Sequence, residues 1–504
     1  MLPGLNSLGI LLKLPYKGAC KCCPEVFSLL STDTPKTEIK KPSIGGVETI
    51  YVKTLGCKVN TFDSHAIENQ FKAVGYQLVD DPALATINVV NTCSVTNNAD
   101  KEARYLARRF RRENADSLVV MTGCYAQTDS SRLMSMDEID VVVPNEVKDQ
   151  IVPFVQEQLR ARREGRVVMK MPEGVKAVSE NRQSHFKSSL TLFDNADSTQ
   201  TRAFVKIQDG CNGFCTYCLI PYARGASRSV PHEDALNEIK RLVSRGTKEI
   251  VLTGIHIGDY GLDNLPEEQR SGAEPFVEFM KRIFDIDGLA RVRISSLEPA
   301  ELTEDLIKVL AENKDRFCDH FHLPLQAGHD DVLRRMRRKY DTARYRESCD
   351  MAYAYFPNIC LGADVIPGFP GETDEQSEAT YEFIKSVGLH YLHVFPYSRR
   401  PNTAANKMPG HLEAEVIKAR ALRLRELSKP LRRAYMSQFI GQTVEVLWER
   451  DMDALGRPLG ITKNYLNIAA SKATENTRQG MTSHWTIRGF VNDDRLLATE
   501  AIIN

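Results

Sequence analysis

The sequence predicts an α/β protein in three parts: an N-terminal open parallel α/β domain, a central partial (β/α)6 barrel and a small C-terminal antiparallel β-barrel. From residue 48, β-branched runs alternate with segments of helical periodicity. A second and longer series of the same kind begins near residue 202. Toward the C-terminus, short β-rich runs are separated by Gly, Asn and Asp turns, which is typical of a small β-barrel.

Length and composition limit the classes of protein that fit this chain. Its 504 residues allow about three domains of ~150 residues each, and 42% hydrophobic with 26% charged residues is ordinary for a globular protein. The net charge is zero, so any nucleic-acid binding must come from local basic patches. Twelve cysteines in a chain of this length, with no secretory signal, indicate thiols for metal or redox chemistry rather than a disulfide scaffold.

The first 45 residues predict little structure. The apolar stretch "LGILLKLPY" is too short to span a bilayer and lacks the features of a signal peptide. We expect residues 1–45 to be an unstructured lead, or a segment included because the start codon was placed too early. A metal site on "ACKCCPE" is the less favoured alternative.

The N-terminal domain, predicted over residues 46–165, places three cysteines at the ends of three strands. Strand-like runs end at Cys57, Cys93 and Cys124, which are 36 and 31 residues apart, the length of a βαβ unit. Parallel strands present their C-terminal ends along one edge of a sheet, so these thiols should meet in space. Buried inert cysteines, or a disulfide plus a free thiol, are the alternatives. Residues 166–200 are predicted to be a linker.

The central domain, predicted over residues 201–437, has about six strand–helix alternations before Ser398. Eight would make a full barrel, so six indicate a partial one. A long helix follows, which Pro430 should interrupt or kink. Residues 438–504 form the predicted C-terminal barrel.

A loop with three closely spaced cysteines, "QDGCNGFCTYCLIP", follows the first strand of the predicted barrel, on the face where barrel enzymes build their sites. Cys211, Cys215 and Cys218 have no fourth ligand nearby; the next candidate is His232. A structural zinc site normally has four ligands, whereas a catalytic zinc with an open position remains possible. A [4Fe–4S] cluster is also held by thiolates, and three of them would leave one iron free to chelate a ligand. The same reasoning applies to the cysteines of the N-terminal domain.

The motif Cys-x3-Cys-x2-Cys after the first barrel strand resembles the cysteine motif of the radical S-adenosylmethionine (SAM) superfamily. Tyr217 matches the position of that motif where the family has an aromatic residue near the adenine. With "TLGCKVN", "NTCSVT" and "MTGCYAQ" in front, the chain resembles the methylthiotransferase family from about residue 48 to its end. Its C-terminal part is similar to the RNA-binding TRAM domain of that family.

Finer motifs indicate a subgroup. "GCKVN", "RGASRS" and "VLTGIHIGDYG" most resemble the bacterial tRNA enzymes that thiomethylate threonylcarbamoyladenosine next to the anticodon. Relatives that act on isopentenyladenosine tend to have Gln-Met-Asn after the first cysteine, and those that act on a ribosomal-protein aspartate tend to have Pro-Lys-Asn. One departure is Ala327, where many relatives have Ser.

The resemblance implies a chemistry. Cys211, Cys215 and Cys218 would hold a [4Fe–4S] cluster that binds SAM and cleaves it to a deoxyadenosyl radical, which serves functionalisation of C2 of the adenine. The three N-terminal cysteines would hold a second [4Fe–4S] cluster that supplies or relays sulfur, and a second SAM would supply the methyl group. The implied partners are tRNA, through its anticodon loop, an electron donor such as a flavodoxin-type reductant, and a sulfur source. No membrane partner is expected, and the expected location is cytoplasmic.

Further candidates for SAM contact lie at strand ends, where turn or strand-end chemistry is the alternative explanation. They are Gly254, Ser295, Ser296, Glu298 and Gln326, with Gly368 and Gly371 of "GFPGET" expected to turn against the adenine.

Three basic stretches are candidates for phosphate contacts: Arg108–Arg112, Arg334–Lys339 and the helix at 418–433. The target base would have to leave its stack to reach the radical. Three rival interpretations remain. The first is a methylthiotransferase that acts on isopentenyladenosine in tRNA or on a ribosomal-protein aspartate. The others are a non-catalytic iron–sulfur RNA-binding redox sensor and a zinc-binding RNA module.

Overall fold

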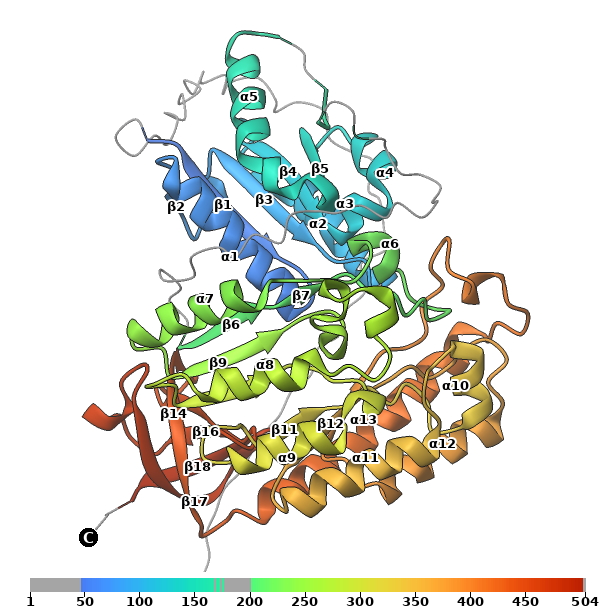
Figure 1. The fold of residues 1–504 in the computed structure, drawn as a ribbon. Coiled ribbons are helices and arrows are strands. Elements are labelled where there is room, and N and C mark those ends of the chain that lie inside the picture. The colour runs from blue at the N-terminus through green and yellow to red at the C-terminus, as the bar shows by residue number, and fades with distance from the viewer. Residues whose placement is uncertain (1–46, 167–168, 173–174, 176–200, 502–504) are drawn as a thin grey trace, which may run out of the picture. The chain divides into compact units, whose positions relative to one another are not determined.

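The computed structural model describes residues 47–166, 169–172, 175 and 201–501 (Figure 1). The expectations for residues 1–45, and for nearly all of the linker after residue 166, lie outside the described residues. Within the described residues, no helix combines the length and apolar character that crossing a membrane requires.

The N-terminal sheet has five parallel strands in the order β2-β1-β3-β4-β5. The strands are β1 (Thr49–Thr54), β2 (Gln77–Leu78), β3 (Ile87–Thr92), β4 (Leu118–Gly123) and β5 (Val141–Pro144). Every residue of β3 and β4 is buried, which explains their continuous β-branched runs. The ends of the three central strands are in register, with Thr54 opposite Asn91 and Thr92 opposite Gly123.

Helices cover both faces of this sheet (Figure 1). They are α1 (Lys58–Ala73), α2 (Asn97–Glu113), α3 (Cys124–Thr128), α4 (Ser130–Met134) and α5 (Ile151–Arg163). One apolar core contains residues of α2, α3 and α4, and a second contains residues of α1 and α5. The Thr96 hydroxyl caps α2 by accepting from the Ala99 amide, so the helix begins directly after the third strand and its loop.

The central domain contains six parallel strands in two groups of three, which confirms the predicted partial barrel. One sheet has the order β10-β9-β6 and the other β11-β12-β13. The strands are β6 (Arg202–Lys206), β9 (Glu249–Thr253), β10 (Arg291–Ile294), β11 (His320–His322), β12 (Cys360–Val365) and β13 (Tyr391–Val394). A parallel bridge between Val292 and Phe317 continues the pairing from β10 toward β11.

Helices outside these strands are α7 (His232–Ser244), α8 (Pro275–Phe284), α9 (Glu304–Glu312), α10 (Asp330–Met336), α11 (Thr342–Tyr355) and α12 (Asp374–Ser386). The cysteine loop is flanked by a two-stranded antiparallel ribbon, β7 (Gln208–Asp209) with β8 (Arg228–Ser229), and contains α6 (Ile220–Arg224). Short 3-10 turns lie at Pro82–Leu84, Asn145–Gln150, Ile257–Asp259, Leu262–Asn264, Glu267–Gln269, Pro299–Glu301, Ala405–Lys407 and Glu475–Thr477.

The long helix α13 (Ala414–Ser437) is continuous through Pro430, so the expected interruption is wrong, whereas a kink at this residue stays a prediction. A proline inside a helix removes one backbone hydrogen bond. Here Leu427, Arg432 and Tyr435 are buried on either side of it, so tertiary packing keeps the helix continuous.

The C-terminal domain is a closed five-stranded barrel in the order β14-β15-β16-β18-β17. Its strands are β14 (Thr443–Met452), β15 (Pro458–Thr462), β16 (Asn467–Ala470), β17 (Thr482–Asn492) and β18 (Arg495–Glu500). The neighbours pair antiparallel, as predicted, except that β16 and β18 pair parallel. Trp448 and Trp485, the two tryptophans of the chain, fill the barrel with ring centroids 4.9 Å apart, and both indole N–H groups donate to the Ser483 hydroxyl.

Candidate functional site

Three cysteines lie at the C-terminal edge of the N-terminal sheet. Cys57 is the residue before α1, Cys93 directly follows β3, and Cys124 is the first residue of α3 after β4. The three strands are adjacent and their ends are in register. All three cysteines are free thiols; Cys57 is exposed, and the other two are buried.

Two glycines allow these thiols to approach the backbone closely. Gly56 has φ +100°, and a Cβ added there would lie 2.8 Å from the Cys93 Sγ. Gly123 has φ +94°, and an added Cβ would lie 2.4 Å from the Thr92 carbonyl oxygen. Residues with a Cβ rarely adopt such φ values, so glycine is required where the chain turns from strand to cysteine.

The surroundings of the buried thiols disfavour thiolates in the free protein. Burial, with the neighbouring Cys124 and Cys57, raises the pKa of Cys93 to about 12. Burial also raises the pKa of Cys124, and the positive charge of Arg224 opposes this. Ligand thiols must lose their protons, so an iron–sulfur cluster would supply the positive charge that this pocket needs.

The second cysteine loop is held in shape by backbone hydrogen bonds. The Cys211 amide donates to the Gly225 carbonyl at 3.1 Å, and the Cys218 amide donates to the Cys215 carbonyl at 3.0 Å. Each sulfur also faces an N–H donor, a feature that suits thiolates bound to a cluster. These donors are the Gly213 amide (3.2 Å to Cys211 Sγ), the Arg338 guanidinium (3.1 Å to Cys215 Sγ) and the Ile220 amide (3.4 Å to Cys218 Sγ).

Neither cysteine triad is arranged for a single metal ion. Zinc binds thiolate sulfur at about 2.3 Å, so tetrahedral ligands lie about 3.8 Å from one another. Among the described residues, only two triads have all their potential ligand atoms within 4.8 Å, and neither contains a cysteine. His232, the nearest sequence candidate for a fourth ligand, begins α7 and stacks on Tyr260 at a centroid distance of 5.0 Å. A cluster of several irons on these cysteines stays a prediction.

Arg338, which the sequence predicted as a phosphate contact, links Tyr217 and Glu298, two of the predicted SAM contacts. The Arg338 guanidinium lies 3.3 Å from the Tyr217 hydroxyl and forms an ion pair with Glu298. The Arg338 side chain is only 6% exposed. It therefore supports the cysteine loop from within and is not a phosphate contact of the stretch Arg334–Lys339.

Gln326 has the geometry of a ligand-binding residue. It has φ +65°, an uncommon value outside glycine, and it is 7% exposed. Its backbone is fixed on both sides, because its amide donates to the Asp364 carbonyl and its carbonyl accepts from the Ile366 amide. Its side-chain Oε1 is buried without a hydrogen-bond partner, so a donor from a ligand would satisfy it.

The other predicted SAM contacts lie at strand ends, as expected, but each also has a structural reason. Ser295 and Ser296 follow β10, and the Ser295 amide donates to the Leu252 carbonyl. A Cβ on Gly254 would lie 2.8 Å from the Ile257 side chain, and one on Gly368 would lie 2.7 Å from Ile417 of α13. Gly371 has φ +74°, which a turn requires. Cofactor contact at these positions remains a prediction.

A buried ionic network around Arg224 was not predicted. The guanidinium is 2% exposed and donates to both carboxylate oxygens of Asp209 at 3.0 and 3.1 Å, to Asp63 at 3.0 Å and to the Asn60 amide oxygen at 2.5 Å. Asp63 and Asn60 belong to α1, whereas Asp209 and Arg224 flank the second cysteine loop. The network thus joins the two cysteine sites. The "RGASRS" motif contains Arg224, but nothing in the sequence indicates its distant partners.

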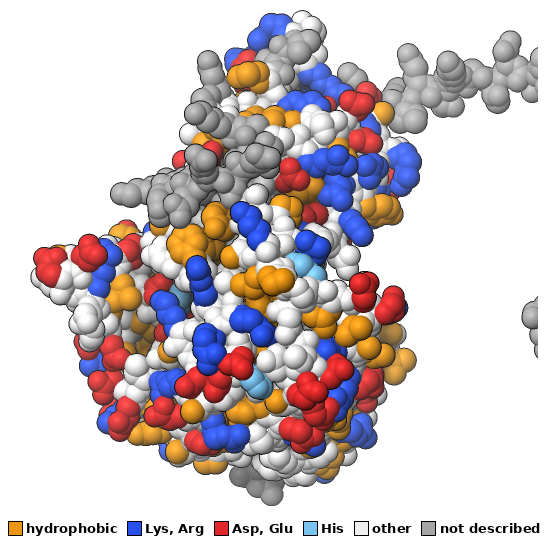
Figure 2. Space-filling view, turned by 90° about the vertical axis from the view of Figure 1, so that its right-hand side faces the viewer, with side chains coloured by type: hydrophobic (Ala, Val, Ile, Leu, Met, Phe, Trp, Pro, Cys, Tyr) orange, Lys and Arg blue, Asp and Glu red, His pale blue; other side chains and the backbone are white. Residues whose placement is uncertain are grey.

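Most cations of the predicted basic stretches already have partners. On α13, Arg420 pairs with Glu372, Arg423 with Glu378, and Lys429 with Glu426. Figure 2 shows that Lys and Arg side chains gather toward the upper and middle parts of the visible face, whereas Asp and Glu are frequent below. Helix α13 therefore offers less free positive charge than its sequence indicates.

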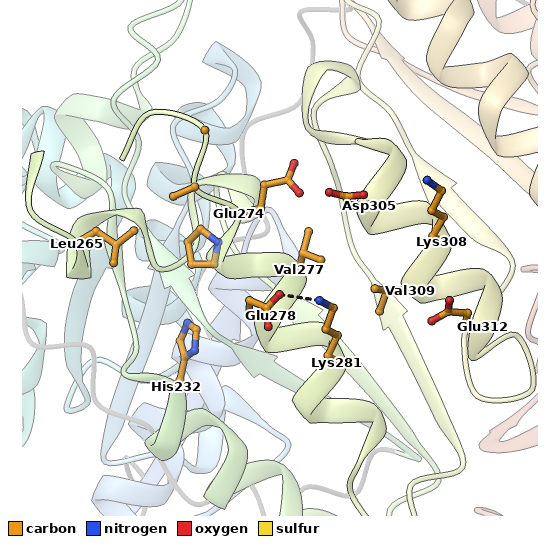
Figure 3. Close-up of a pocket in the computed structure, with 13 residues that line it drawn as sticks. His232, Leu265, Glu274, Val277, Glu278, Lys281, Asp305, Lys308, Val309 and Glu312 are labelled. Atoms are coloured by element: carbon orange, nitrogen blue, oxygen red, sulfur yellow. Dashed lines mark hydrogen bonds and ion pairs between the residues drawn. The ribbon is translucent and has the colours of Figure 1, made fainter. Parts of the chain in front are cut away.

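A cavity of about 810 Å³ lies between α8 and α9 (Figure 3). Its wall includes Glu274, Glu278 and Lys281 from the α8 side and Asp305 and Lys308 from α9. No cysteine lines it, so it is separate from both candidate sites.

Comparison with known proteins agrees with the geometry. The Radical SAM superfamily model matches residues 205–384, and the model named Uncharacterized protein family UPF0004 matches residues 49–144. These matches, together with the partial barrel and its three-cysteine loop, define the chain as a radical SAM enzyme.

Comparison with curated proteins of similar sequence shows to which family of radical SAM enzymes the chain belongs. Threonylcarbamoyladenosine tRNA methylthiotransferase MtaB of Bacillus subtilis is 37% identical over 431 residues, covering 85% of this chain and 91% of its own length. The protein of the same name from Aquifex aeolicus is 34% identical over 82% of this chain and 95% of its own. A tRNA-2-methylthio-N(6)-dimethylallyladenosine synthase of Clostridium botulinum is 29% identical over 89% of this chain and 92% of its own. The chain belongs to the radical SAM methylthiotransferase family.

Proposed function

We propose that this protein inserts sulfur and a methyl group at C2 of N6-threonylcarbamoyladenosine, at position 37 of tRNA. The observation that carries the proposal is the 37% identity with the Bacillus subtilis enzyme of that name over nearly its whole length. The presence of one three-cysteine site in each of two adjoining domains supports it. The family uses SAM and [4Fe–4S] clusters as cofactors.

The six cysteines are proposed as the cluster ligands. Cys211, Cys215 and Cys218 would hold the cluster that binds SAM, and their facing N–H donors fit a thiolate-bound group. Cys57, Cys93 and Cys124 would hold the second cluster. Their position on one sheet edge, at the ends of three adjacent strands, supports a shared cluster.

When bound, the clusters and SAM supply the one-electron chemistry and the sulfur and methyl groups, which no amino-acid side chain can provide. The chain itself contributes position and environment. Tyr217, Arg338 and Glu298 form a connected wall beside the cysteine loop, and Gln326 offers an unpaired acceptor to the cofactor. The Arg224 network keeps the two cysteine sites at a fixed separation, which reaction between groups bound at them requires.

The partners follow from the proposed reaction. The tRNA would present its anticodon loop with the target base turned out of its stack, and the C-terminal barrel over residues 438–504 would bind RNA as a TRAM-like domain. A flavodoxin-type reductant would supply electrons, and a separate sulfur donor would restore the second cluster. We propose a cytoplasmic location, with an N-terminal domain at 46–165 and a radical SAM domain at 201–437.

The first test counts iron and sulfide in anaerobically reconstituted protein and in the variant Cys57→Ala/Cys93→Ala/Cys124→Ala. We expect about eight irons in the wild type and about four in the variant, because each [4Fe–4S] cluster contains four. About four irons in both proteins would show that the N-terminal cysteines are not ligands.

The second test incubates the reduced protein with SAM and tRNA anticodon stem-loops, followed by mass analysis of the nucleosides. The expected product is the methylthio derivative of threonylcarbamoyladenosine. Modification of isopentenyladenosine, or of a ribosomal-protein aspartate, would instead assign the chain to another branch of the family. Failure to cleave SAM at all would favour a redox sensor.

A further inference from the structure

Two histidines and an aspartate meet at the ends of three adjacent barrel strands. His322 is the last residue of β11, and Asp364 of β12 is the register partner of His393 of β13. His322 lies opposite Gly362, two residues before Asp364, so alternation along the strands places all three side chains on one face. The residues that alternate with them belong to the apolar core beneath the helices: Phe321, Ala363 and Leu392. The three polar side chains therefore face away from the helices, toward the inside of the partial barrel.

Their potential ligand atoms converge at distances that suit one metal ion. His322 Nε2 lies 2.9 Å and His393 Nδ1 lies 3.4 Å from Asp364 Oδ1, and the three atoms are all within 4.8 Å of one another. Zinc binds imidazole nitrogen and carboxylate oxygen at about 2.0–2.2 Å, which puts tetrahedral ligand atoms about 3.4 Å apart. Small adjustments of the side chains would therefore allow all three to bind the same ion.

His322 has the outer hydrogen bond that is typical of metal-binding histidines. Its second nitrogen, Nδ1, lies 3.3 Å from the Tyr391 hydroxyl, which is also 2.8 Å from His320 Nε2. Tyr391 can occupy this position because its register partner Gly362 has no side chain; a Cβ there would lie 2.0 Å from the Tyr391 ring. Metal-binding histidines almost always engage their other ring nitrogen, which fixes the orientation and tautomer of the ring.

The cluster is accessible from one side. The side chain of His322 is 9% exposed, whereas that of Asp364 is 27% and that of His393 is 56% exposed. Three protein ligands leave a tetrahedral metal ion with one free position. Gln326, the proposed cofactor contact, adjoins the cluster because its amide donates to the Asp364 carbonyl. A ligand at the free position would thus lie on the edge of the barrel that carries the proposed SAM contact.

We propose that His322, Asp364 and His393 bind a divalent transition-metal ion such as zinc, with one position open to an oxygen ligand. Two imidazoles and one carboxylate suit zinc and its first-row neighbours, whereas Ca²⁺ and Mg²⁺ prefer oxygen ligands. The ligands include no cysteine, so this ion is additional to the two proposed clusters. The inference goes beyond the proposed function and does not depend on it.

The test dialyses the reconstituted protein, in which clusters occupy the cysteine sites, against zinc(II). Its variants are His322→Gln and His393→Gln, and the control is His484→Gln, which changes an exposed histidine of β17. Zinc and iron are counted by mass spectrometry, and X-ray absorption at the zinc edge identifies the atoms bound to zinc. We expect the wild type and the control to hold a zinc with nitrogen and oxygen ligands at about 2.0–2.2 Å. Both other variants should lose this zinc and keep their iron.

Tyr391→Phe tests the outer hydrogen bond separately. This change keeps the ring but removes the hydroxyl beside His322. The Kd for zinc, measured against a competing chelator, should rise about tenfold or more, because outer partners of metal ligands typically contribute that much to affinity.

Three results would overturn the inference: wild-type protein that binds no zinc, zinc bound through sulfur alone at about 2.3 Å, or equal zinc contents in the wild type and both histidine variants. If His322→Gln fails to fold, His393→Gln decides, because its exposed side chain should leave the urea midpoint unchanged. Wild-type protein that holds the nitrogen-bound zinc but modifies no stem-loop would support this inference and refute the proposed function alone.

Discussion

Replacing Arg224 by methionine should destabilise the protein strongly, because the substitution removes the centre of a buried ionic network. The guanidinium makes four hydrogen bonds, two to Asp209 and one each to Asp63 and Asn60, and it is 2% exposed. Removing one partner of a buried ion pair costs about 3–5 kcal/mol. Asp63 and Asp209 both keep Lys206 as a partner, so we expect the lower end, ~3 kcal/mol.

The assay is urea unfolding of the cluster-free protein, followed by circular dichroism. A loss of ~3 kcal/mol with an m-value of about 3 kcal/mol/M moves the midpoint down by about 1 M. The matched control is Arg282→Met, which removes an exposed surface pair with Glu233 and should leave the midpoint almost unchanged. In the reconstituted variant we also expect a lower iron content, because the positive charge of Arg224 favours the thiolate of Cys124. Equal midpoints for the two variants would refute the argument that this network holds the cysteine sites together.

Three further predictions follow from single residues. Gly123→Ala should lower the iron content toward about four per chain, because its Cβ would lie 2.4 Å from the Thr92 carbonyl oxygen. The control is Gly75→Ala, since Gly75 has a similar φ but no atom within 4 Å of an added Cβ. This control should keep its full iron content and lose only ~1–2 kcal/mol of stability. Burial lowers the pKa of His390 to about 4, so the stability that its neutral ring provides should be complete above pH ~6.5 and fall by about 3 kcal/mol as the pH drops to about 4; His390→Gln should flatten a plot of urea midpoint against pH over that window. Gln326→Ala should raise the Kd for SAM about tenfold by calorimetry, since it removes a buried unpaired acceptor, and an unchanged Kd would exclude this contact.

The sequence predicted those features that depend on local periodicity. Cys57, Cys93 and Cys124 could be placed on one sheet edge because the strand–helix period fixes where successive parallel strands end. The same periodicity gave the six barrel strands. The three-cysteine loop needed only its own spacing, since its ligands lie within eight residues.

Features that depend on distant partners could not be predicted. Arg338 belongs to a basic run that is typical of a solvated helix, yet Glu298 and Tyr217 hold it inside the domain. Arg224 pairs with residues about 160 positions away on another domain. His393 has no neighbouring motif that indicates Asp364 as its partner. In each case, burial and pairing arise from tertiary packing, which charge patterns along the chain do not encode.

The tryptophan pair in the C-terminal barrel gives this protein an intrinsic optical reporter of one domain. Trp448 and Trp485 are the chain's two tryptophans, and both belong to strands of the same barrel. Light absorbed selectively by indole will therefore be emitted from this domain alone, without any label. Stem-loop RNA that changes the emission of protein with a constant iron content would touch or reshape the barrel. Denaturant titrations that are followed by tryptophan fluorescence will report unfolding of the barrel separately from unfolding of the two domains that contain the cysteines.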